Sequence, residues 1–575
     1  MTFRPDHRIL APLAALALAG CGAGQPEQDG MERLRSQVAR GDTAAAQLTL
    51  DQLQERGTPR SEYAALAGEA ALARGELAEA RRWLGDGAFS KDTAGLGFRL
   101  LAQLALREGK PNEAANALEM ALKSDPADPE VWVDIGRLRY RLGNHIAALE
   151  AAERAIELGP GNVQALRFRG QLARDSEGVA PAAAWFARAR ESEPWDEGLR
   201  LEHAAALLDA GEIEPARALL YEREIYLPQA HYLKAVAAAR GGDFGDAREA
   251  LDRSGPTRER SAAARMLSAI IDVERGALES AAQTLDQLAR EQPDNRRAHE
   301  LLAYVLMRNG NEDELVYRYA DAARGPWGSV WMRTLVGRAL EALDRRDEAA
   351  VFLDLAPTRS GRLEYLPPTG VGGSGALARR DEIRARLGVG DSAAALRAAR
   401  SFAGEFPGSS DAAAMLGDAL LAAGQAREAR AAYAKSARVR QSWPLVLRMS
   451  STLPKDEASR LIVQFAAANP MNAEAAALAA EAYATAGRWD RAAAALDRSL
   501  ANGMRRVPWV LAARSVAAGR LDEGDGRAQL DWALEAYEVQ RMDPAAMSAL
   551  LGALPPGDEA MRSNLRTKLA ALADR

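Results

Sequence analysis

The stretch Pro129–Pro160, PEVWVDIGRLRYRLGNHIAALEAAERAIELGP, decides the fold of this chain. It reads as two amphipathic helices with a turn between them, because apolar residues recur at helical spacing on both sides of the turn. The stretch Val163–Pro194 repeats the pattern 34 residues later and aligns Ala148 with Ala182. A third copy runs over Asp411–Ala437. A fixed period of this length predicts a helical-repeat protein.

The three copies define a grid that covers most of the chain. Repeat starts fall at 27, 61, 95, 129, 163, 197, 228, 262, 296, 330, 376, 410, 439 and 473, most of them 34 residues apart. Position 20 of the grid is alanine in 13 of the 14 repeats, and position 8 is Gly or Ala in 11 of 14. Helices approach closely only where side chains are small, so these positions predict helix–helix contacts.

The pattern resembles the tetratricopeptide repeat. Repeats of that family carry small residues at positions 8 and 20, a glycine near 15, a bulky residue at 24 and a proline at 32. The resemblance implies an all-α fold, a right-handed α-solenoid of about 14 helix pairs with a concave groove. We expect the glycines near position 15 to end the first helices in the left-handed conformation. These are Gly75, Gly109, Gly143, Gly211 and Gly424.

One stretch suggests a different function. Gly370, Gly372 and Gly375 spell G-x-G-x-x-G, the fingerprint of a dinucleotide-binding turn. That fingerprint works only between a β-strand and a helix, and Pro367 and Pro368 just before it do not suit an interior strand. The step from repeat start 330 to 376 exceeds 34 by 12 residues, the length of the segment 364–375. We therefore interpret the glycines as part of a loop between repeats, not as a nucleotide site.

The N-terminus carries the single cysteine of the chain. Arg4 and Arg8 form a short basic start, and an apolar stretch too short to span a bilayer follows. The stretch then ends in Leu18-Ala19-Gly20-Cys21, which resembles the lipobox of bacterial lipoproteins. The resemblance implies cleavage before Cys21, acylation of that residue and, with Gly22 in place of Asp, a periplasm-facing position on the outer membrane. Two or three acyl chains hold a protein on a membrane stably.

The repeat grid and the N-terminal pattern together predict the organisation of the chain. We expect a signal peptide over 1–20, a lipidated linker over 21–26, a first repeat array over 27–363, an inter-repeat loop over 364–375, a second array over 376–506 and a helical cap over 507–575. The cap would cover the apolar face of the last repeat.

Composition and residue spacing argue against several functions. The formal net charge of −6 gives no basic footprint for a nucleic acid. His145, His203, His231 and His299 fall in four different repeats, and with Cys21 acylated no cysteine remains for a metal site or for nucleophilic catalysis. No phosphate-binding loop of the G-x-x-x-x-G-K-[ST] type occurs. The sequence thus predicts a non-enzyme without cofactor or metal.

A binding groove is the more natural site. In this repeat, first-helix positions 2, 5, 9, 12 and 13 usually line the concave face. In the repeats that start at 95, 129 and 163, this surface is rich in arginines and amides that could clamp carboxylates, phosphates or an extended acidic peptide. The candidate groove residues are Arg99, Gln103, Arg107, Arg137, Tyr140, Arg141, Gln164, Arg167, Gln171 and Arg174.

Two functions stay open at this point. The first is a non-catalytic scaffold or adaptor lipoprotein that binds envelope proteins through its groove. By resemblance to tetratricopeptide lipoproteins, it would act in a secretion, pilus or polysaccharide-export system. The second is a periplasmic binder of an exopolysaccharide or peptidoglycan strand. Sugars favour stacked Trp and Tyr, and the tryptophans here mostly occupy packing or turn positions, so protein binding is favoured.

Overall fold

The computed structural model describes residues 26–255, 261–293, 295–325, 328–355, 376–521 and 526–573. The expected acylation site Cys21 and the glycine loop 364–375 lie outside the described residues. All regular structure within those ranges is helical, with 32 α-helices and one short 3-10 helix. The chain forms two compact units, and the division falls after Leu138, inside helix α7.

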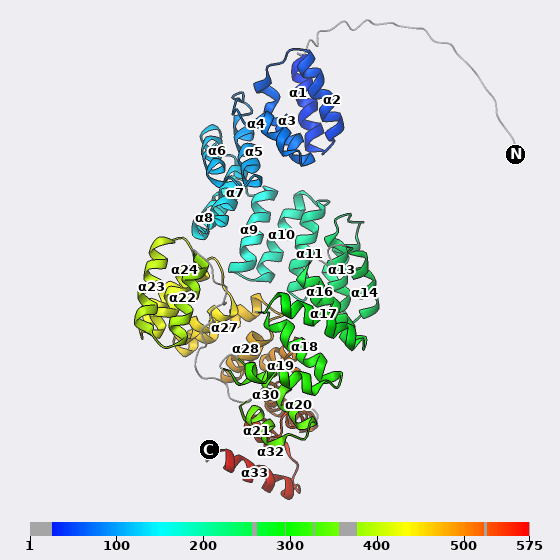
Figure 1. Ribbon diagram of the computed structural model, residues 1–575, viewed down its shortest axis with the longest axis vertical. Helices are drawn as coiled ribbons and strands as arrows, with labels where there is room; N and C mark the ends of the chain where they lie inside the picture. The colour runs from blue at the N-terminus through cyan, green and yellow to red at the C-terminus, as the bar shows by residue number, and fades with distance from the viewer. Residues whose placement is uncertain are drawn as a thin grey trace, which may run out of the picture. The chain divides into compact units, whose positions relative to one another are not determined.

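The first unit ends within α7 and consists of successive helix hairpins (Figure 1). Its helices are α1 (Pro26–Ala39), α2 (Thr43–Glu55), α3 (Arg60–Arg74), α4 (Leu77–Leu84), α5 (Ala94–Arg107), α6 (Pro111–Ser124) and most of α7 (Pro129–Arg141).

The second unit contains two arrays of helices. The first array comprises α8 (His145–Leu158), α9 (Val163–Ser176), α10 (Val179–Ser192), α11 (Glu197–Asp209), α12 (Ile213–Tyr221), α13 (Gln229–Arg240), α14 (Phe244–Arg253), α16 (Ala262–Glu274), α17 (Leu278–Glu291), α18 (Arg296–Arg308), α19 (Glu312–Arg324), α20 (Val330–Ala342) and α21 (Arg346–Leu355).

The second array follows the undescribed segment 356–375. It comprises α22 (Ala376–Gly388), α23 (Ser392–Glu405), α24 (Ser410–Ala422), α25 (Ala426–Ala437), α26 (Trp443–Ser451), α27 (Lys455–Ala468), α28 (Ala473–Thr485), α29 (Trp489–Ala501), η1 (Met504–Arg506), α30 (Pro508–Leu521), α31 (Arg527–Val539), α32 (Pro544–Ala553) and α33 (Glu559–Ala573).

Each repeat start of the sequence grid corresponds to one helix pair, from α1 and α2 through α28 and α29. The predicted fold class, an all-α solenoid of helix pairs, is thereby confirmed. The small residues act as expected: a Cβ on Gly170 would lie 3.0 Å from the ring of Phe186. At Gly417, an added Cβ would overlap the ring of Tyr433. Position 8 therefore stays small because the bulky residue at position 24 packs directly on it.

The turns within the helix pairs also follow the prediction. Gly75, Gly109, Gly143, Gly211 and Gly424 all have φ between 75° and 83°. The backbone N–H groups that follow the helix bond back to its last carbonyls there, as from Gly75 to Leu72 at 3.1 Å. Glycine is favoured because a left-handed residue at the end of a helix carries no Cβ penalty.

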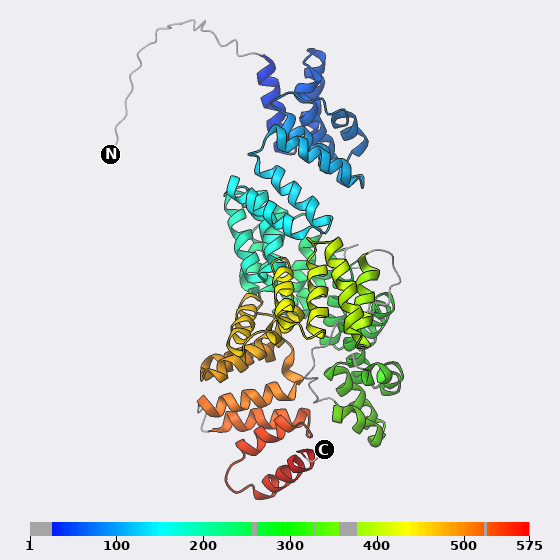
Figure 2. The ribbon, with the colours of Figure 1, turned by 90° about the vertical axis from the view of Figure 1, so that its left-hand side faces the viewer.

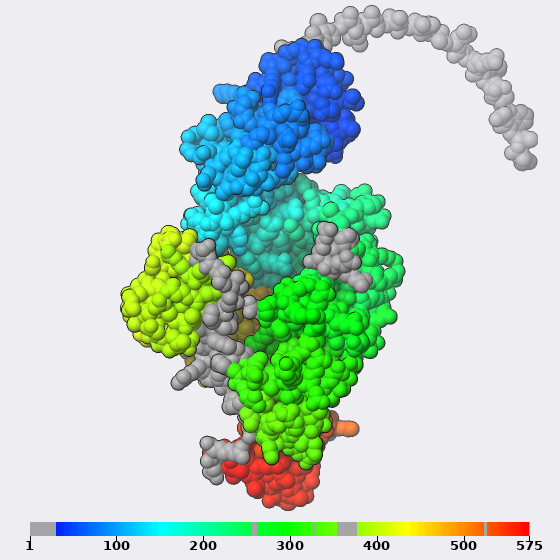
Figure 3. Space-filling model, viewed as in Figure 1, coloured from blue at the N-terminus to red at the C-terminus, as the bar shows by residue number. Residues whose placement is uncertain are grey.

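Within the second unit, the two arrays contact each other along a line that we call the seam. Figures 1 and 2 show the second array, coloured yellow to red, beside the cyan and green helices of the first. The space-filling view shows helices of both arrays on one face (Figure 3). Along the seam, turns and helix ends of the first array, together with one residue inside α18 and one inside α20, meet loops and helix ends of the second. The paired residues are Asn144 with Gly408, His145 with Ser410, Asp175 with Gln441, Gly178 with Ala468, Gly211 with Met471, Tyr304 with Arg506, and Arg338 with Gln540.

The apolar cores lie inside the arrays. One core joins buried residues from Ala269 to Phe352 in the first array. Two others, spanning Ile383 to Leu445 and Ala477 to Leu565, belong to the second. Each of these cores therefore lies within one array, and the seam contacts named above are hydrogen bonds and close approaches to glycine backbones.

Candidate functional site

In the first unit, the predicted groove residues bond to neighbouring repeats. Arg99 of α5 forms an ion pair with Glu130 of α7. One turn further along each helix, the side-chain amide of Gln103 donates to Asp134 at 2.8 Å. Arg107 points back instead and donates to the carbonyl oxygen of Leu72 at 2.9 Å. These residues connect adjacent first helices across the concave surface.

Burial is the main influence on the pKa values of two carboxyl groups in this network. Asp134 is almost fully buried, and burial raises its pKa above the usual value, against the lowering effects of Gln103 and Arg99. Burial likewise raises the pKa of Glu69, whereas the charge of Arg99 lowers it. Arg137 lies 3.7 Å from Asp134 and contributes to the same balance. The groove of the first unit therefore offsets its arginines with its own acids.

The second unit shows the same arrangement, and there the arginine and the carboxylate form a bidentate pair. The Nε and Nη2 groups of Arg167 on α9 donate to the two carboxylate oxygens of Glu202 of α11, at 3.0 Å and 2.9 Å. The amide of Gln171 donates to the same carboxylate at 3.1 Å. The hydrogen bonds to Glu202 are the main cause of the raised pKa of Arg167. Bidentate Arg–carboxylate pairs hold the planar fork in one orientation.

Two more predicted residues continue this row. Arg174 pairs with Asp209 of α11, and Arg240 of α13 approaches the same carboxylate to 3.7 Å. The hydroxyl of Tyr140 donates to Asp175 at 3.3 Å. Acidic residues of one repeat thus accept from basic or hydroxyl groups of its neighbours, and the row spans four successive first helices, α7, α9, α11 and α13.

A pocket of about 670 Å³ opens on this surface. The structure brings together three predicted groove residues there, Arg167, Gln171 and Arg174. The remaining lining residues are Asp175, Phe186, Gly198, Leu201, Glu202, Ala205, Leu227 and Gln229. Apolar side chains from two repeats therefore stand beside amides and two paired arginines, a mixture of apolar and polar lining that is typical of ligand pockets.

Not every predicted groove residue lines this pocket. Arg141 is exposed at the end of α7, and Gln164 is half-buried in the first turn of α9. The sequence reading also missed the acids Glu202 and Asp209, which neutralise the arginines. A signal existed, since each acid stands 35 residues after its arginine, in the next repeat of the grid. Leu227 belongs to the loop before α13 and follows no helix pattern.

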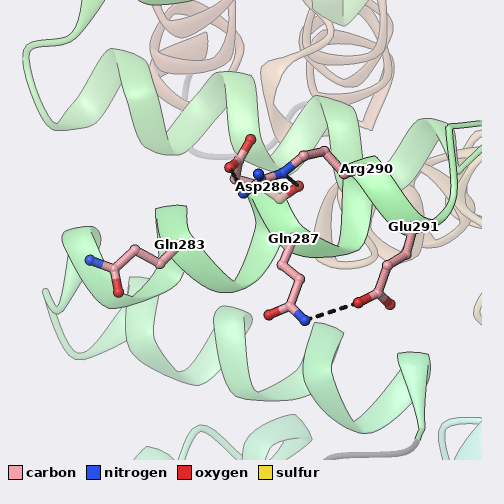
Figure 4. Close-up of a pocket in the computed structure, with 5 residues that line it drawn as sticks. All are labelled: Gln283, Asp286, Gln287, Arg290 and Glu291. Atoms are coloured by element: carbon pink, nitrogen blue, oxygen red, sulfur yellow. Dashed lines mark hydrogen bonds and ion pairs between the residues drawn. The ribbon is translucent and has the colours of Figure 1, made fainter.

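A second hollow, of about 530 Å³, lies on α17 (Figure 4). All five lining residues come from this one helix: Gln283, Asp286, Gln287, Arg290 and Glu291. The amide of Gln287 donates to Glu291 at 2.9 Å, and Asp286 pairs with both Arg290 and Arg318. The hollow is polar and its charges are already paired, so it is a weaker candidate site than the groove pocket.

The side chains and helices of the described residues bear on metal binding and on membrane insertion. Among them, no group of three or more His, Cys, Asp or Glu side chains is arranged to hold a metal ion. In the same part of the chain, every helix is too short or too polar to cross a membrane.

Fold and groove together define a helical-repeat protein with a candidate binding surface on its first helices. The family model described as tetratricopeptide repeat matches residues 99–163, 133–195, 266–328, 380–444 and 455–506. The chain therefore contains tetratricopeptide repeats, and the resemblance in the sequence is confirmed to that extent. No curated protein matches the chain.

Several solved structures resemble parts of the chain. PilW, described as a widely conserved type IV pilus biogenesis factor, is 21% identical over 37% of this chain and 98% of its own, with a TM-score of 0.32. PilF of Pseudomonas aeruginosa is 17% identical over 43% and 99%, with a TM-score of 0.29. The Cut9–Hcn1 complex is 15% identical over 88% and 99%, with a TM-score of 0.31. At such values these structures indicate no function for this chain.

Proposed function

We propose that this protein is a non-catalytic scaffold that binds an extended segment of a partner protein in the groove pocket of α9, α11 and α13. The observation that carries the proposal is the pocket itself, where Phe186, Leu201 and Leu227 stand beside Gln171 and Gln229. Amide side chains can pair with a peptide backbone, and the apolar residues can receive one side chain of the partner.

The paired arginines refine the chemistry of that partner. Arg167 and Arg174 already bond to Glu202 and Asp209, so an acidic peptide would have to displace strong internal partners. Breaking a partly buried pair leaves an uncompensated charge and is costly. We therefore propose a partner segment of mixed polarity and low net charge, in place of a strongly acidic one.

We further propose that the scaffold is tethered to the bacterial envelope through acylated Cys21, facing the periplasm. The support is the apolar N-terminal stretch followed by the single cysteine. Replacing Cys21 by Ser removes the acylated side chain and should move the protein from the membrane fraction to the soluble fraction. A Cys21→Ser protein that stays in the membrane fraction would contradict the anchor.

A charge-swap variant tests the groove. Arg167→Glu combined with Glu202→Arg keeps an ion pair in the fold but reverses the polarity that faces the partner. We expect crosslinking pull-downs from envelopes to lose partners with this variant. The matched control is Arg345→Glu with Glu348→Arg, an exposed pair at the start of α21 whose nitrogen and oxygen lie 2.7 Å apart. Unchanged partners in the groove variant would contradict the proposal.

A second candidate function rests on exposed aromatic residues at the edge of the same repeats. Trp195 and Tyr226 are 56% and 79% exposed, in loops that flank α11 and α12. Exposed rings could stack on the sugars of a glycan strand, although Arg223 already covers one face of Trp195 at 5.5 Å. Binding of isolated peptidoglycan or exopolysaccharide that is lost in Trp195→Ala would favour this function over peptide binding.

A further inference from the structure

One side chain of the seam changes its hydrogen-bonding character when it takes up a proton. His145 is the first residue of α8 in the first array. Its Nδ1 atom accepts the backbone N–H of Ser410, the first residue of α24 in the second array, at 3.3 Å. A ring nitrogen can accept only while it carries no proton, so this contact requires the neutral imidazole.

Neighbouring contacts fix the same end of the seam. The backbone N–H of Ile146 donates to the carbonyl oxygen of Gly408 at 3.4 Å. A Cβ on Gly408 would run into the side chain of Asn144. The loop before α24 therefore lies directly against the start of α8, and a proton on Nδ1 would point at the N–H of Ser410 with no room between them.

The surroundings of the imidazole come from three helices. Tyr140 of α7 lies against it, with ring centres 4.8 Å apart. Burial lowers the pKa of His145 below its usual value of 6.5, and the charges of Asp411 on α24 and Asp175 on α9 raise it. The charge of Arg440 lowers the pKa of Tyr140, and the charge of Asp411 raises the pKa of Arg384. Despite the two acids, the docked seam favours the neutral ring.

The seam is also connected to the groove pocket. The backbone N–H of Gln441, from the second array, donates to the carbonyl oxygen of Asp175 at 2.7 Å. Asp175 lines the pocket and accepts from Tyr140, whose ring packs on His145. One residue therefore belongs to both the proposed binding site and the contact between the arrays.

We propose that His145 is the pH-sensitive element of a clasp between the two arrays of the second unit, closed with a neutral imidazole and released by its protonation. Release removes the support that Gln441 gives to Asp175, so it alters the rim of the groove pocket. This consequence for binding rests on the proposed function, whereas the release itself does not.

The direction of the pH effect follows from linkage. In the released state His145 is exposed and regains its usual proton affinity, so protons bind more tightly to the released state than to the closed one. The closed state is fully favoured above pH 6.5 and loses its advantage as the pH falls below that value. One proton changes the ratio of closed to released molecules by up to about tenfold per pH unit.

Spin-label distances test the clasp directly in the full-length chain. Cys21→Ser removes the native thiol, and Tyr226→Cys and Val389→Cys place labels on the two arrays, at side chains that are 79% and 81% exposed. We expect one narrow distance distribution at about pH 7.5 and a longer, broader one at about pH 5. The same distribution at both pH values would overturn the proposal.

Two variants assign the change to His145. His145→Gln offers the Ser410 N–H an acceptor that does not titrate, so we expect the narrow distribution at both pH values. His231→Gln removes a half-buried histidine of α13 outside the seam and should respond as the parent does. Release of His145→Gln at about pH 5 would overturn the proposal. Far-UV circular dichroism checks that each protein is folded, and if His145→Gln is not folded, His145→Asn takes its place.

The clasp and the proposed function can fail separately. If a partner crosslinks in the groove but the distance between the arrays does not change with pH, the clasp alone is overturned. A seam that releases in acid, in a protein whose groove captures no partner, would overturn peptide binding alone.

Discussion

The interior of the second array and the seam beside it are held together differently. Inside the array, Asp418 is 4% exposed and its carboxylate lies 2.9 Å from the guanidinium of Arg448, with the Tyr433 hydroxyl bonded to it at 2.8 Å. At the seam, single hydrogen bonds and one stacked arginine join surfaces that have their own cores. The comparison teaches that burial within repeats fixes the fold, whereas a few polar contacts fix how the arrays dock.

The largest expected effect comes from breaking the buried pair. Arg448→Leu leaves the Asp418 carboxylate buried without its counter-charge, and such losses cost about 3–5 kcal/mol. We expect the free energy of unfolding from urea titrations to fall by that amount. Arg346→Leu, at an exposed ion pair, should change it by less than about 0.5 kcal/mol. An equal fall in the free energy of unfolding in both variants would contradict the difference between the buried pair and the exposed one.

His203 tests the interior of the first array. It is 8% exposed, and burial, followed by the charge of Arg190, lowers its pKa to about 4. The unfolded chain binds this proton more tightly, so stability is full above pH 6.5 and falls until about pH 4. The loss is about 3 kcal/mol. His203→Leu should flatten this part of a stability-against-pH curve, and an unchanged curve would contradict the assignment.

Overpacking comes next in size. Gly417→Ala places a Cβ against the ring of Tyr433 and should cost about 1–3 kcal/mol. Gly404→Ala on α23 is the matched control, because a Cβ there meets nothing within 4 Å. Better helix propensity should make that variant neutral or slightly stabilising. Thermal melts compare the two, and a Gly417→Ala protein as stable as the parent would refute close packing at position 8.

The smallest expected effect is at the seam. Arg506 lies 4.3 Å from the ring centre of Tyr304 and 5.0 Å from that of Trp331, and it donates to the Tyr304 hydroxyl at 2.8 Å. Arg506→Ala should weaken docking by about 1 kcal/mol without lowering the melting temperature of the arrays. Its neighbour Arg505, 72% exposed, gives the control Arg505→Ala. Spin-label distances between the arrays measure the docking. If Arg506→Ala unfolds the arrays, the residue stabilises the fold and the proposed role in docking is contradicted.

Much of the fold follows from the sequence, because each repeat is specified locally. Ala148 and Ala182 reveal the period, and Gly143 reveals the turn. Asp344 shows that the turn requires a backbone conformation and not a particular residue. Its φ of 59° is left-handed, and it takes the turn position that glycine holds in most repeats. The sequence grid therefore indicates where the helices of most pairs begin and end, although α26 begins at Trp443, four residues after the repeat start at 439.

The seam could not be predicted in the same way. Its bonds join residues more than 200 positions apart in many cases, and 265 apart for His145 and Ser410. Many use backbone atoms, as from Arg338 to the carbonyl oxygen of Val539 at 3.1 Å. Backbone acceptors leave no trace in residue identity. At the groove, Arg167 and Gln171 could be identified, but their shared partner Glu202 depends on the offset between neighbouring helices.

Photo-crosslinking from inside the groove tests the central claim most directly. A photoreactive residue replaces Ala205, which lines the pocket, or Ala184, which is exposed on α10 and lines no part of it. The account predicts that light produces a discrete crosslinked partner from position 205 in intact cells and none from 184. The same adducts from both positions, or a partner captured only at 184, would contradict protein binding in this groove.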